Sequence, residues 1–161
     1  MIMNKTELKQ ILTDLFKEQK LAVLSTHNKE GPYSSLVAFA FTEDLKYILF
    51  ATTRATRKYA NMTDNSSVSL LVDNRSNDDE DFYRAVAVTA TGKAVEVEDG
   101  ERENLLNIYL DKLPYLKHFV TSPTCAFLKV TVKTYYIVNR FQNVMEFHVN
   151  YENIDSSQEY R

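Results

Sequence analysis

The sequence has few of the residues on which several kinds of site depend. Its 161 residues include a single cysteine, Cys125, which excludes an internal disulfide and a cluster of thiolate metal ligands. It has three glycines, so a glycine-rich phosphate-binding loop is not available. No apolar run approaches the roughly 20 residues that cross a bilayer, so we expect no membrane span. Because the N-terminal residues also show no charged-then-apolar leader, we expect a reducing, cytoplasmic location.

The sequence also lacks an excess of positive charge. The chain carries 19 basic and 22 acidic residues, a net charge of -3. This balance argues against a protein that binds nucleic acid through its overall field. An oligonucleotide-binding barrel would use some of the ten tyrosines and nine phenylalanines as stacking platforms, but it would also need a basic groove. Any anion site in this chain must therefore be local.

Hydrophobic periodicity predicts one helix followed by a chain rich in strands. Apolar residues from Leu8 to Phe16 recur at three and four residues, and Asn4 with Glu7 forms a possible capping pair. The period then changes to two, or to short apolar runs between turn signals. The predicted strands are 21–26, 33–41, 47–52, 67–73, 83–99, 125–141 and 144–149, and the predicted helical segments before the last two are 100–112, capped by Asp99, and 115–120.

These elements predict a mainly β fold of the α+β type. Six or seven strands with short turns favour a closed or nearly closed antiparallel barrel, since closure removes exposed edges. The fifth strand should bend at Gly92. We expect a single domain over residues 1–161, with an N-terminal helix, a helical insertion before the last strands and a loosely ordered polar tail from about residue 150.

The most informative segment is "ILFATTRATRKYANM", residues 48–62. Arg54, Arg57 and Lys58 crowd the start of a short helix, where cations are unfavourable unless an anion lies among them. The hydroxyls of Thr53 and Thr56, the two cations Arg57 and Lys58 and the unpaired N–H groups at a helix start are the donors that a phosphate requires. From spacing alone, a solvated basic turn explains the segment equally well.

Other reactive residue types give no pattern of a site. The acidic run 78–81 lacks the ligand spacing of a calcium loop and is interpreted as a solvated connection. Cys125 has no cation or histidine next to it in sequence, so we expect a buried, inert thiol. Ser34 and Ser35 lack the context of a nucleophile elbow. Three scattered histidines show no metal-ligand spacing and are interpreted as structural: His27, His118 and His148.

Taken together, the segments from Leu8 to Phe147 resemble the FMN-binding split-barrel family that includes pyridoxamine 5'-phosphate oxidase. The most specific part of the resemblance is the strand-to-helix segment "FATTRATRKYANM". In that family the counterpart of "TRK" grips the FMN phosphate, which implies phosphate contacts for Thr56, Arg57 and Lys58. The resemblance further implies flavin contacts from Thr52 and Thr53 and from the backbone around Ser35, Leu36 and Val37.

The resemblance also implies a homodimer with two FMN molecules at the subunit interface. Each site would then be completed by the partner chain, and Asn74 and Arg140 are candidates for that contribution. The implied function is an FMN-dependent oxidoreductase whose substrate is unknown. Two alternatives stay open: a non-catalytic flavin-binding module, and a haem-binding or haem-degrading relative with His118 or His148 as the axial ligand.

The sequence departs from the oxidase subfamily at its C-terminal end. Enzymes that act on vitamin B6 phosphates carry a tryptophan-bearing segment there, followed by an Arg-x-His-x-Arg pattern that holds the substrate phosphate. This chain has no tryptophan, and its tail "NYENIDSSQEYR" shows no such pattern. We therefore do not expect pyridoxamine 5'-phosphate oxidase activity.

Overall fold

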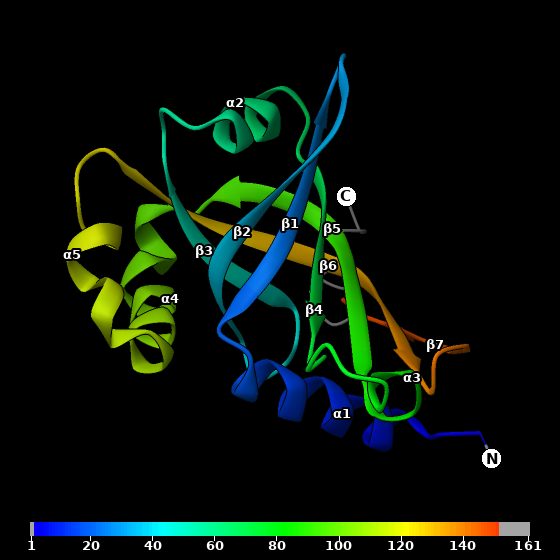
Figure 1. Ribbon diagram of the computed structural model, residues 1–161. Helices are drawn as coiled ribbons and strands as arrows, with labels where there is room; N and C mark the ends of the chain where they lie inside the picture. The colour runs from blue at the N-terminus through cyan, green and yellow to red at the C-terminus, as the bar shows by residue number, and fades with distance from the viewer. Residues whose placement is uncertain (1, 152–161) are drawn as a thin grey trace, which may run out of the picture.

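One antiparallel sheet of seven strands dominates residues 2–151, which the computed structural model describes, and six of these strands close into a barrel (Figure 1). Around the barrel the order is β3-β2-β1-β4-β5-β6, and pairing of β3 with β6 closes the ring. β7 pairs with the far half of β6, outside the ring. The predicted barrel is thus confirmed. The strands are β1 (Leu21–Asn28), β2 (Gly31–Phe41), β3 (Tyr47–Thr53), β4 (Ser67–Asp73), β5 (Val86–Glu96), β6 (Cys125–Asn139) and β7 (Asn143–His148).

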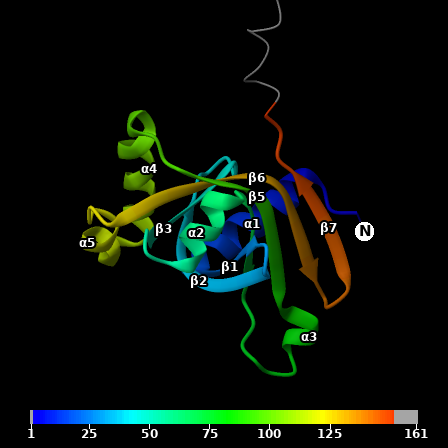
Figure 2. The same ribbon diagram turned by 90° about the horizontal axis from the view of Figure 1, so that it is seen from above.

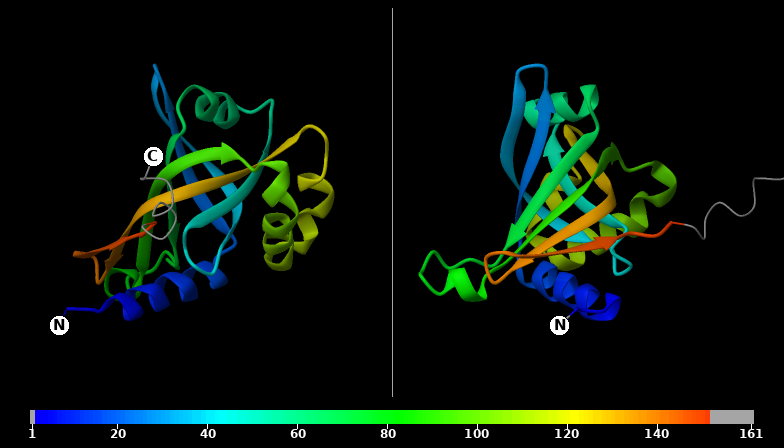
Figure 3. Two further views of the ribbon diagram at one scale, coloured as in Figure 1. Left: turned by 180° about the vertical axis from the view of Figure 1, so that it is seen from behind. Right: turned by 90° about the vertical axis from the view of Figure 1, so that its right-hand side faces the viewer.

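Helices lie at both ends and on one side of the barrel. In Figure 1, α1 (Lys5–Glu18) lies below the barrel and α2 (Arg57–Asp64) lies above it, and the view from above in Figure 2 shows α2 over the barrel. The insertion between β5 and β6 flanks β2 and β3; it comprises α4 (Asp99–Lys112), a 3-10 turn (Pro114–Leu116) and α5 (Lys117–Val120). The right-hand view of Figure 3 shows the β1–β2 hairpin rising beside α2 at the top of the molecule.

The first helix begins as the sequence predicts. Asn4 is its N-cap: the Asn4 side chain accepts a hydrogen bond from the Glu7 N–H, and the Glu7 carboxylate accepts one from the Asn4 N–H, a complete capping box. Its apolar stripe is buried under the barrel and contributes four side chains to the main core: Leu8, Leu12, Leu15 and Phe16. This burial of one helical face closes the lower end of the barrel.

Two clusters of apolar side chains form the core. The main cluster fills the barrel, with inward-facing residues of every barrel strand and the apolar face of α1. A smaller cluster lies outside the ring between α4 and the outer faces of β2, β3 and β6, where the Tyr109 and Phe127 rings meet edge to face at 5.4 Å. Cys125 belongs to this second cluster and is 3% exposed, which confirms the expectation of a buried thiol.

Several details differ from the sequence prediction at element ends. Asp99 is the first residue of α4 and Glu98 takes the cap position, without a side-chain hydrogen bond. The acidic run contains a single helical turn, α3 (Asp81–Arg84), which the sequence did not predict. The Asp81 carboxylate accepts hydrogen bonds from the backbone N–H groups of Ser76 and Asn77, and these lower its pKa. The predicted loose tail lies largely outside the described residues.

The predicted bend at Gly92 is a break in the β5–β6 register. Thr91 pairs with Thr134 and Gly92 with Val132, so Lys133 is an extra residue on β6. A Cβ atom built on Gly92 would lie 2.2 Å from the carbonyl oxygen of Thr131. The two backbones approach so closely here that a side chain on residue 92 has no room.

The contact between α1 and α4 contains a half-buried lysine. The Lys112 Nζ donates a hydrogen bond of 2.7 Å to the carbonyl oxygen of Gln19, at the C-terminal end of α1, and lies 3.7 Å from the centre of the Phe39 ring. Burial lowers the pKa of Lys112 to about 8. The protonated side chain therefore ties two helices together, but at a desolvation cost.

Gly92→Ala should destabilise the protein by about 2–3 kcal/mol, because the new methyl group overlaps the Thr131 carbonyl. Gly100→Ala is the matched control: nothing lies within 4 Å of its Cβ position, and in α4 alanine should be neutral or stabilise by up to about 1 kcal/mol. Urea unfolding of both variants measures the difference. Equal stability of the two variants would contradict the close approach at Gly92.

Lys112 should make the stability of the protein rise with pH between 8 and 10. The folded protein loses this proton near pH 8 and the unfolded chain only near 10.5, so the unfolded chain binds more protons in this window. Burial also raises the pKa of Cys125 and of several tyrosines, which lowers stability in the same window, so the contribution of Lys112 is read from the difference between the wild type and Lys112→Met. Between pH 8 and pH 10 the free energy of unfolding of the wild type should shift by about 2 kcal/mol toward higher stability relative to that of Lys112→Met, as measured by urea unfolding. An equal change in both proteins would contradict this.

Candidate functional site

β2 and β3 separate at the upper part of the barrel and leave an opening between them. β2 pairs with β3 over Phe39–Phe41, whereas it pairs with β1 along Gly31–Ala38. Within residues 2–151, no strand pairs with the other edge of this upper segment of β2. Its backbone N–H and C=O groups on that side are therefore left to solvent or to a ligand.

Ser35 lies on this unpaired segment. It is the register partner of Leu24, a fully buried barrel residue, so its side chain is on the face of β2 that turns toward the interior. Among the described residues its hydroxyl oxygen is buried and has no hydrogen-bond partner. A buried hydroxyl without a partner costs roughly 1–3 kcal/mol, so Ser35 is an unused donor beside the opening.

Beyond the end of β3 the chain turns into α2, and Thr56 caps this helix. The Thr56 hydroxyl accepts a hydrogen bond from the Tyr59 N–H at 3.3 Å and donates one of 2.9 Å to the Thr53 carbonyl. It also lies 2.9 Å from the Thr52 hydroxyl, on a side chain that is 3% exposed. The cap leaves the N–H groups of Arg57 and Lys58 without intrahelical acceptors, at the positive end of the helix.

Arg54 has a structural role. Its backbone N–H donates to the Thr124 carbonyl, and its guanidinium donates to the carbonyls of Pro123 and Cys125, each at 3.1 Å. A second guanidinium nitrogen forms an ion pair of 3.1 Å with Glu96. One of the three cations that crowd this segment in the sequence therefore fastens the β3–α2 turn to the start of β6.

The Glu96 carboxylate also accepts a hydrogen bond of 2.6 Å from the Tyr59 hydroxyl. Glu96 therefore joins the β3–α2 turn and α2 to the end of β5. The hydrogen bond from Tyr59, with a further contribution from Arg54, lowers the pKa of Glu96. The same bond raises the pKa of Tyr59. Since Glu96 neutralises Arg54, it adds no negative charge for the two remaining cations.

Arg57 and Lys58 have no carboxylate partner in the part of the chain that the structure describes. Among residues 2–151 neither side chain forms an ion pair, and the first turn of α2 contains no acidic residue. The Arg57 guanidinium lies over the ring of Tyr33, 5.5 Å from its centre, and so reaches from α2 to β2. The structure thus brings together two cations, two helix-start N–H groups and the unpaired edge of β2.

The structure places two further predicted residues elsewhere. Asn74 exchanges two hydrogen bonds with the backbone of Val86, and Arg140 is in the β6–β7 turn with a positive φ of 46°. Figure 1 shows the end of β4, which Asn74 follows, and the turn from β6 to β7, which contains Arg140, near α3 and away from α2. These two residues do not join Arg57 and Lys58 within one chain, and their expected contribution across a subunit interface stays a prediction.

The histidines also occupy distinct places. His118 is exposed on α5, and both ring nitrogens of His148 are engaged, with Glu146 at 3.0 Å and with the Thr134 hydroxyl at 3.2 Å. His27 instead lines a groove of about 810 Å³ with Lys93 and Lys133. This groove was not predictable from the sequence, because its residues lie far apart in the chain and form no local motif.

The closed six-stranded barrel with an added strand defines a split-barrel protein. The sequence model of pyridoxamine 5'-phosphate oxidase matches residues 8–139. The chain therefore belongs to the pyridoxamine 5'-phosphate oxidase family. No curated protein matches the sequence.

Solved structures share this fold at low sequence identity. A heme binding protein from Mycobacterium smegmatis is 15% identical with a TM-score of 0.77; the match covers 92% of this chain and 59% of that protein. General Stress Protein 26 from Bacillus anthracis is 21% identical with a TM-score of 0.66, over 88% of this chain and 98% of that one. A FAD-binding protein from Mesorhizobium loti is 14% identical with a TM-score of 0.64, over 80% and 90%.

No helix within residues 2–151 has both the length and the apolar character that crossing a membrane requires.

Proposed function

We propose that the protein binds FMN at the opening between β2 and β3, with the phosphate at the start of α2. The observation that carries this proposal is a pair of cations, Arg57 and Lys58, that have no carboxylate partner among residues 2–151 and lie beside the N–H groups that the Thr56 cap leaves unpaired. A dianionic phosphate offsets both charges and accepts from both N–H groups.

The residues around the opening fit the rest of the cofactor. The Ser35 hydroxyl and the unpaired edge of β2 at Leu36 and Val37 supply hydrogen-bonding groups that a ribityl chain and a flavin ring can use. Thr53 is half-buried at the end of β3, on the side of the opening that faces this edge. Thr52 holds the Thr56 cap, so its contribution is to fix the phosphate loop.

The proposed activity is that of an oxidoreductase with an unidentified substrate. Bound FMN supplies hydride and electron transfer, while the chain binds and orients it. Burial raises the pKa of Cys125, so its thiol stays protonated and unreactive at neutral pH. A non-catalytic flavin module has the same site, and reduction by NADH or NADPH separates the two: a bound flavin that neither reduces supports the module.

Haem binding is the other alternative in this fold. The two histidines considered as axial ligands do not line the opening: His118 is exposed on α5, and the ring nitrogens of His148 are both engaged. The cations at α2 could also pair with haem propionates, so the preference for flavin rests on the lack of either histidine at the opening. A haem titration followed by the Soret band compares the two cofactors directly.

A second copy of the chain is the partner that we propose. Leu36 is 64% and Leu21 is 55% exposed on the outer face of the barrel. Val23 lies between Leu36 and Leu71 in the strand register and continues this apolar surface. A homodimer that covers this surface would also bring a second chain to the edge of β2, where the proposed flavin site is open.

FMN should bind at one molecule per chain, and riboflavin should bind weaker by orders of magnitude because it lacks the phosphate. Arg57→Ala should weaken FMN roughly 10- to 100-fold, and Arg57→Ala/Lys58→Ala should weaken it further, though not additively, since both cations share one partner. Riboflavin affinity should hardly change in either variant. Fluorescence titration measures these affinities.

Lys9→Ala, an exposed lysine of α1 at the opposite end of the barrel, is the control for lost charge and should bind FMN like the wild type. Circular dichroism confirms that each variant keeps its sheet. If the folded Arg57→Ala/Lys58→Ala variant binds FMN as tightly as the wild type, residues 54–58 form a solvated basic turn and not a phosphate site.

Light scattering should give twice the 18.6 kDa of one chain at micromolar concentration. Leu36→Glu should shift the protein toward the monomer, because it places a charge in the surface that the second copy covers. Val95→Glu is the matched control, since Val95 is 47% exposed on β5 outside this surface. A monomeric mass for the FMN-bound wild type would refute the dimer.

A further inference from the structure

A groove of about 810 Å³ crosses the outer face of β1, β4 and β5, and its floor consists of small side chains. Ser25, Ser69 and Thr91 are neighbours in the strand register and alternate with buried core residues, so they point outward in one row. Because these side chains are short, the surface is hollow here. The volume lies in the range of ordinary small-molecule sites, about 300–1,000 Å³.

The irregularity in the β5–β6 ladder shapes one wall of the groove. Lys93 pairs with Thr131, and Lys133 is the extra residue of the bulge opposite Gly92. A bulge turns its side chain out of the regular alternation, and in this protein the bulged residue lines the groove with Lys93. The absent side chain at Gly92 allows the approach of the two backbones that this arrangement requires.

Within the described residues, the positive charge of the groove is not offset by a carboxylate. Neither Lys93 nor Lys133 forms an ion pair among residues 2–151, and no acidic side chain is among the described residues that line the groove. The whole chain has a net charge of -3, so this is a local concentration of positive charge. A concave surface focuses such a field toward an anion.

Tyr151 closes the groove at the same wall. Its hydroxyl lies 2.7 Å from the Val132 carbonyl and 3.0 Å from the Lys46 carbonyl and shares its single proton between them, so its ring is held in place. Val149, whose N–H donates to the Lys133 carbonyl, adds an apolar side chain beside it. The groove therefore offers a fixed aromatic and apolar surface next to two ammonium groups.

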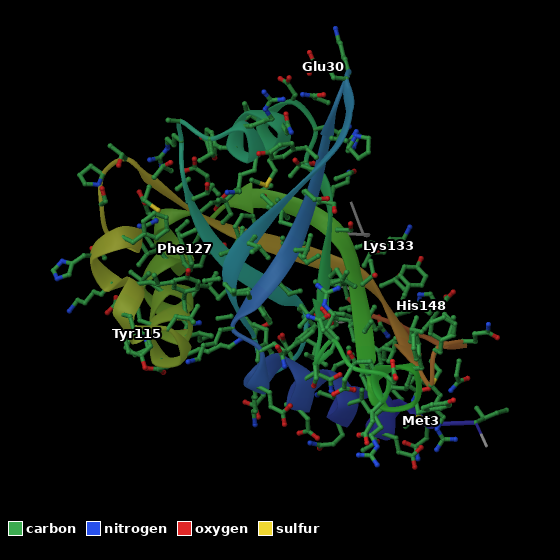
Figure 4. The ribbon with its side chains drawn as sticks, viewed as in Figure 1. Met3, Glu30, Tyr115, Phe127, Lys133 and His148 are labelled. Carbon is green, nitrogen blue, oxygen red and sulfur yellow. The ribbon has the colours of Figure 1, made fainter. Side chains whose placement is uncertain are left out.

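We propose that this groove binds a small organic anion, with a flat apolar body against the small-residue floor and a carboxylate, sulfonate or phosphate group at Lys93 and Lys133. None of the residues proposed to bind FMN lines the groove, and of the β2 segment that borders the opening only Pro32, near the tip of the β1–β2 hairpin, is among its lining residues. Figure 4 shows Lys133 on the side of the barrel away from Tyr115 and Phe127, which lie with the helical insertion. Binding here is independent of the proposed flavin site.

The test is a fluorescence titration with 8-anilinonaphthalene-1-sulfonate, an aromatic sulfonate. The wild type should bind one probe per chain, and Lys93→Gln/Lys133→Gln should bind it at least 10-fold more weakly, since two charge-assisted contacts are lost. The uncharged probe N-phenyl-1-naphthylamine should bind both proteins within about 2-fold, because it uses only the apolar surface. Lys9→Gln/Lys117→Gln, with two exposed lysines outside the groove, should bind the sulfonate like the wild type.

Competition with FMN separates this inference from the proposed cofactor site. FMN should not displace the sulfonate, and Arg57→Ala/Lys58→Ala should bind it unchanged. Three results would each overturn the inference. FMN could displace the sulfonate, or Lys93→Gln/Lys133→Gln could bind the sulfonate as tightly as the wild type. The third is that Lys9→Gln/Lys117→Gln loses as much sulfonate affinity as the groove variant. Circular dichroism and thermal melting show that the variants are folded, so a weaker titration reports binding.

Discussion

Pairing of β3 with β6 is the constraint on which the rest of the molecule depends. The ladder runs along the whole of β3, from Tyr47 to Thr53, and closes the barrel. Because β3 pairs with β6 along its whole length, it separates from β2 beyond the Phe39–Phe50 pair. The opening beside Ser35 is therefore a direct consequence of barrel closure. Arg54 extends the same connection beyond the last paired residue by binding three carbonyls at the start of β6. The start of α2 is thereby held against a rigid ring.

β6 carries two partners in succession, and this division shapes the two sites. Its first half pairs with β3, its second half pairs with β7, and the change falls at the bulge that contains Lys133. The opening at α2 depends on the first half, and the charged wall of the groove depends on the bulge. One continuous strand therefore positions both sites, although none of the residues proposed to bind FMN lines the groove.

Local patterns were sufficient to predict the strands, the longer helices and the closed barrel, but not the single turn of α3. The capping pair at Asn4, the alternation within strands and the glycine at the bend are each visible within a few residues of sequence, and the structure confirms them. The three cations near the start of α2 are likewise visible within one short stretch of sequence. The separate role of Arg54 was not predictable, because its partners at 96 and 123–125 are 42 to 71 residues away. The unpaired hydroxyl of Ser35 and the groove likewise depend on strand register, which a single sequence does not give.

The buried position of Cys125 has a practical consequence for spectroscopy. It is the one sulfhydryl in the chain, and it lies at 3% exposure within the cluster beneath α4. Maleimide and methanethiosulfonate reagents attack accessible thiolates, so the native protein presents almost no background to them. A cysteine introduced at an exposed site such as Glu30, at the tip of the β1–β2 hairpin (Figure 4), would accept a spin label or a fluorophore selectively without first removing Cys125.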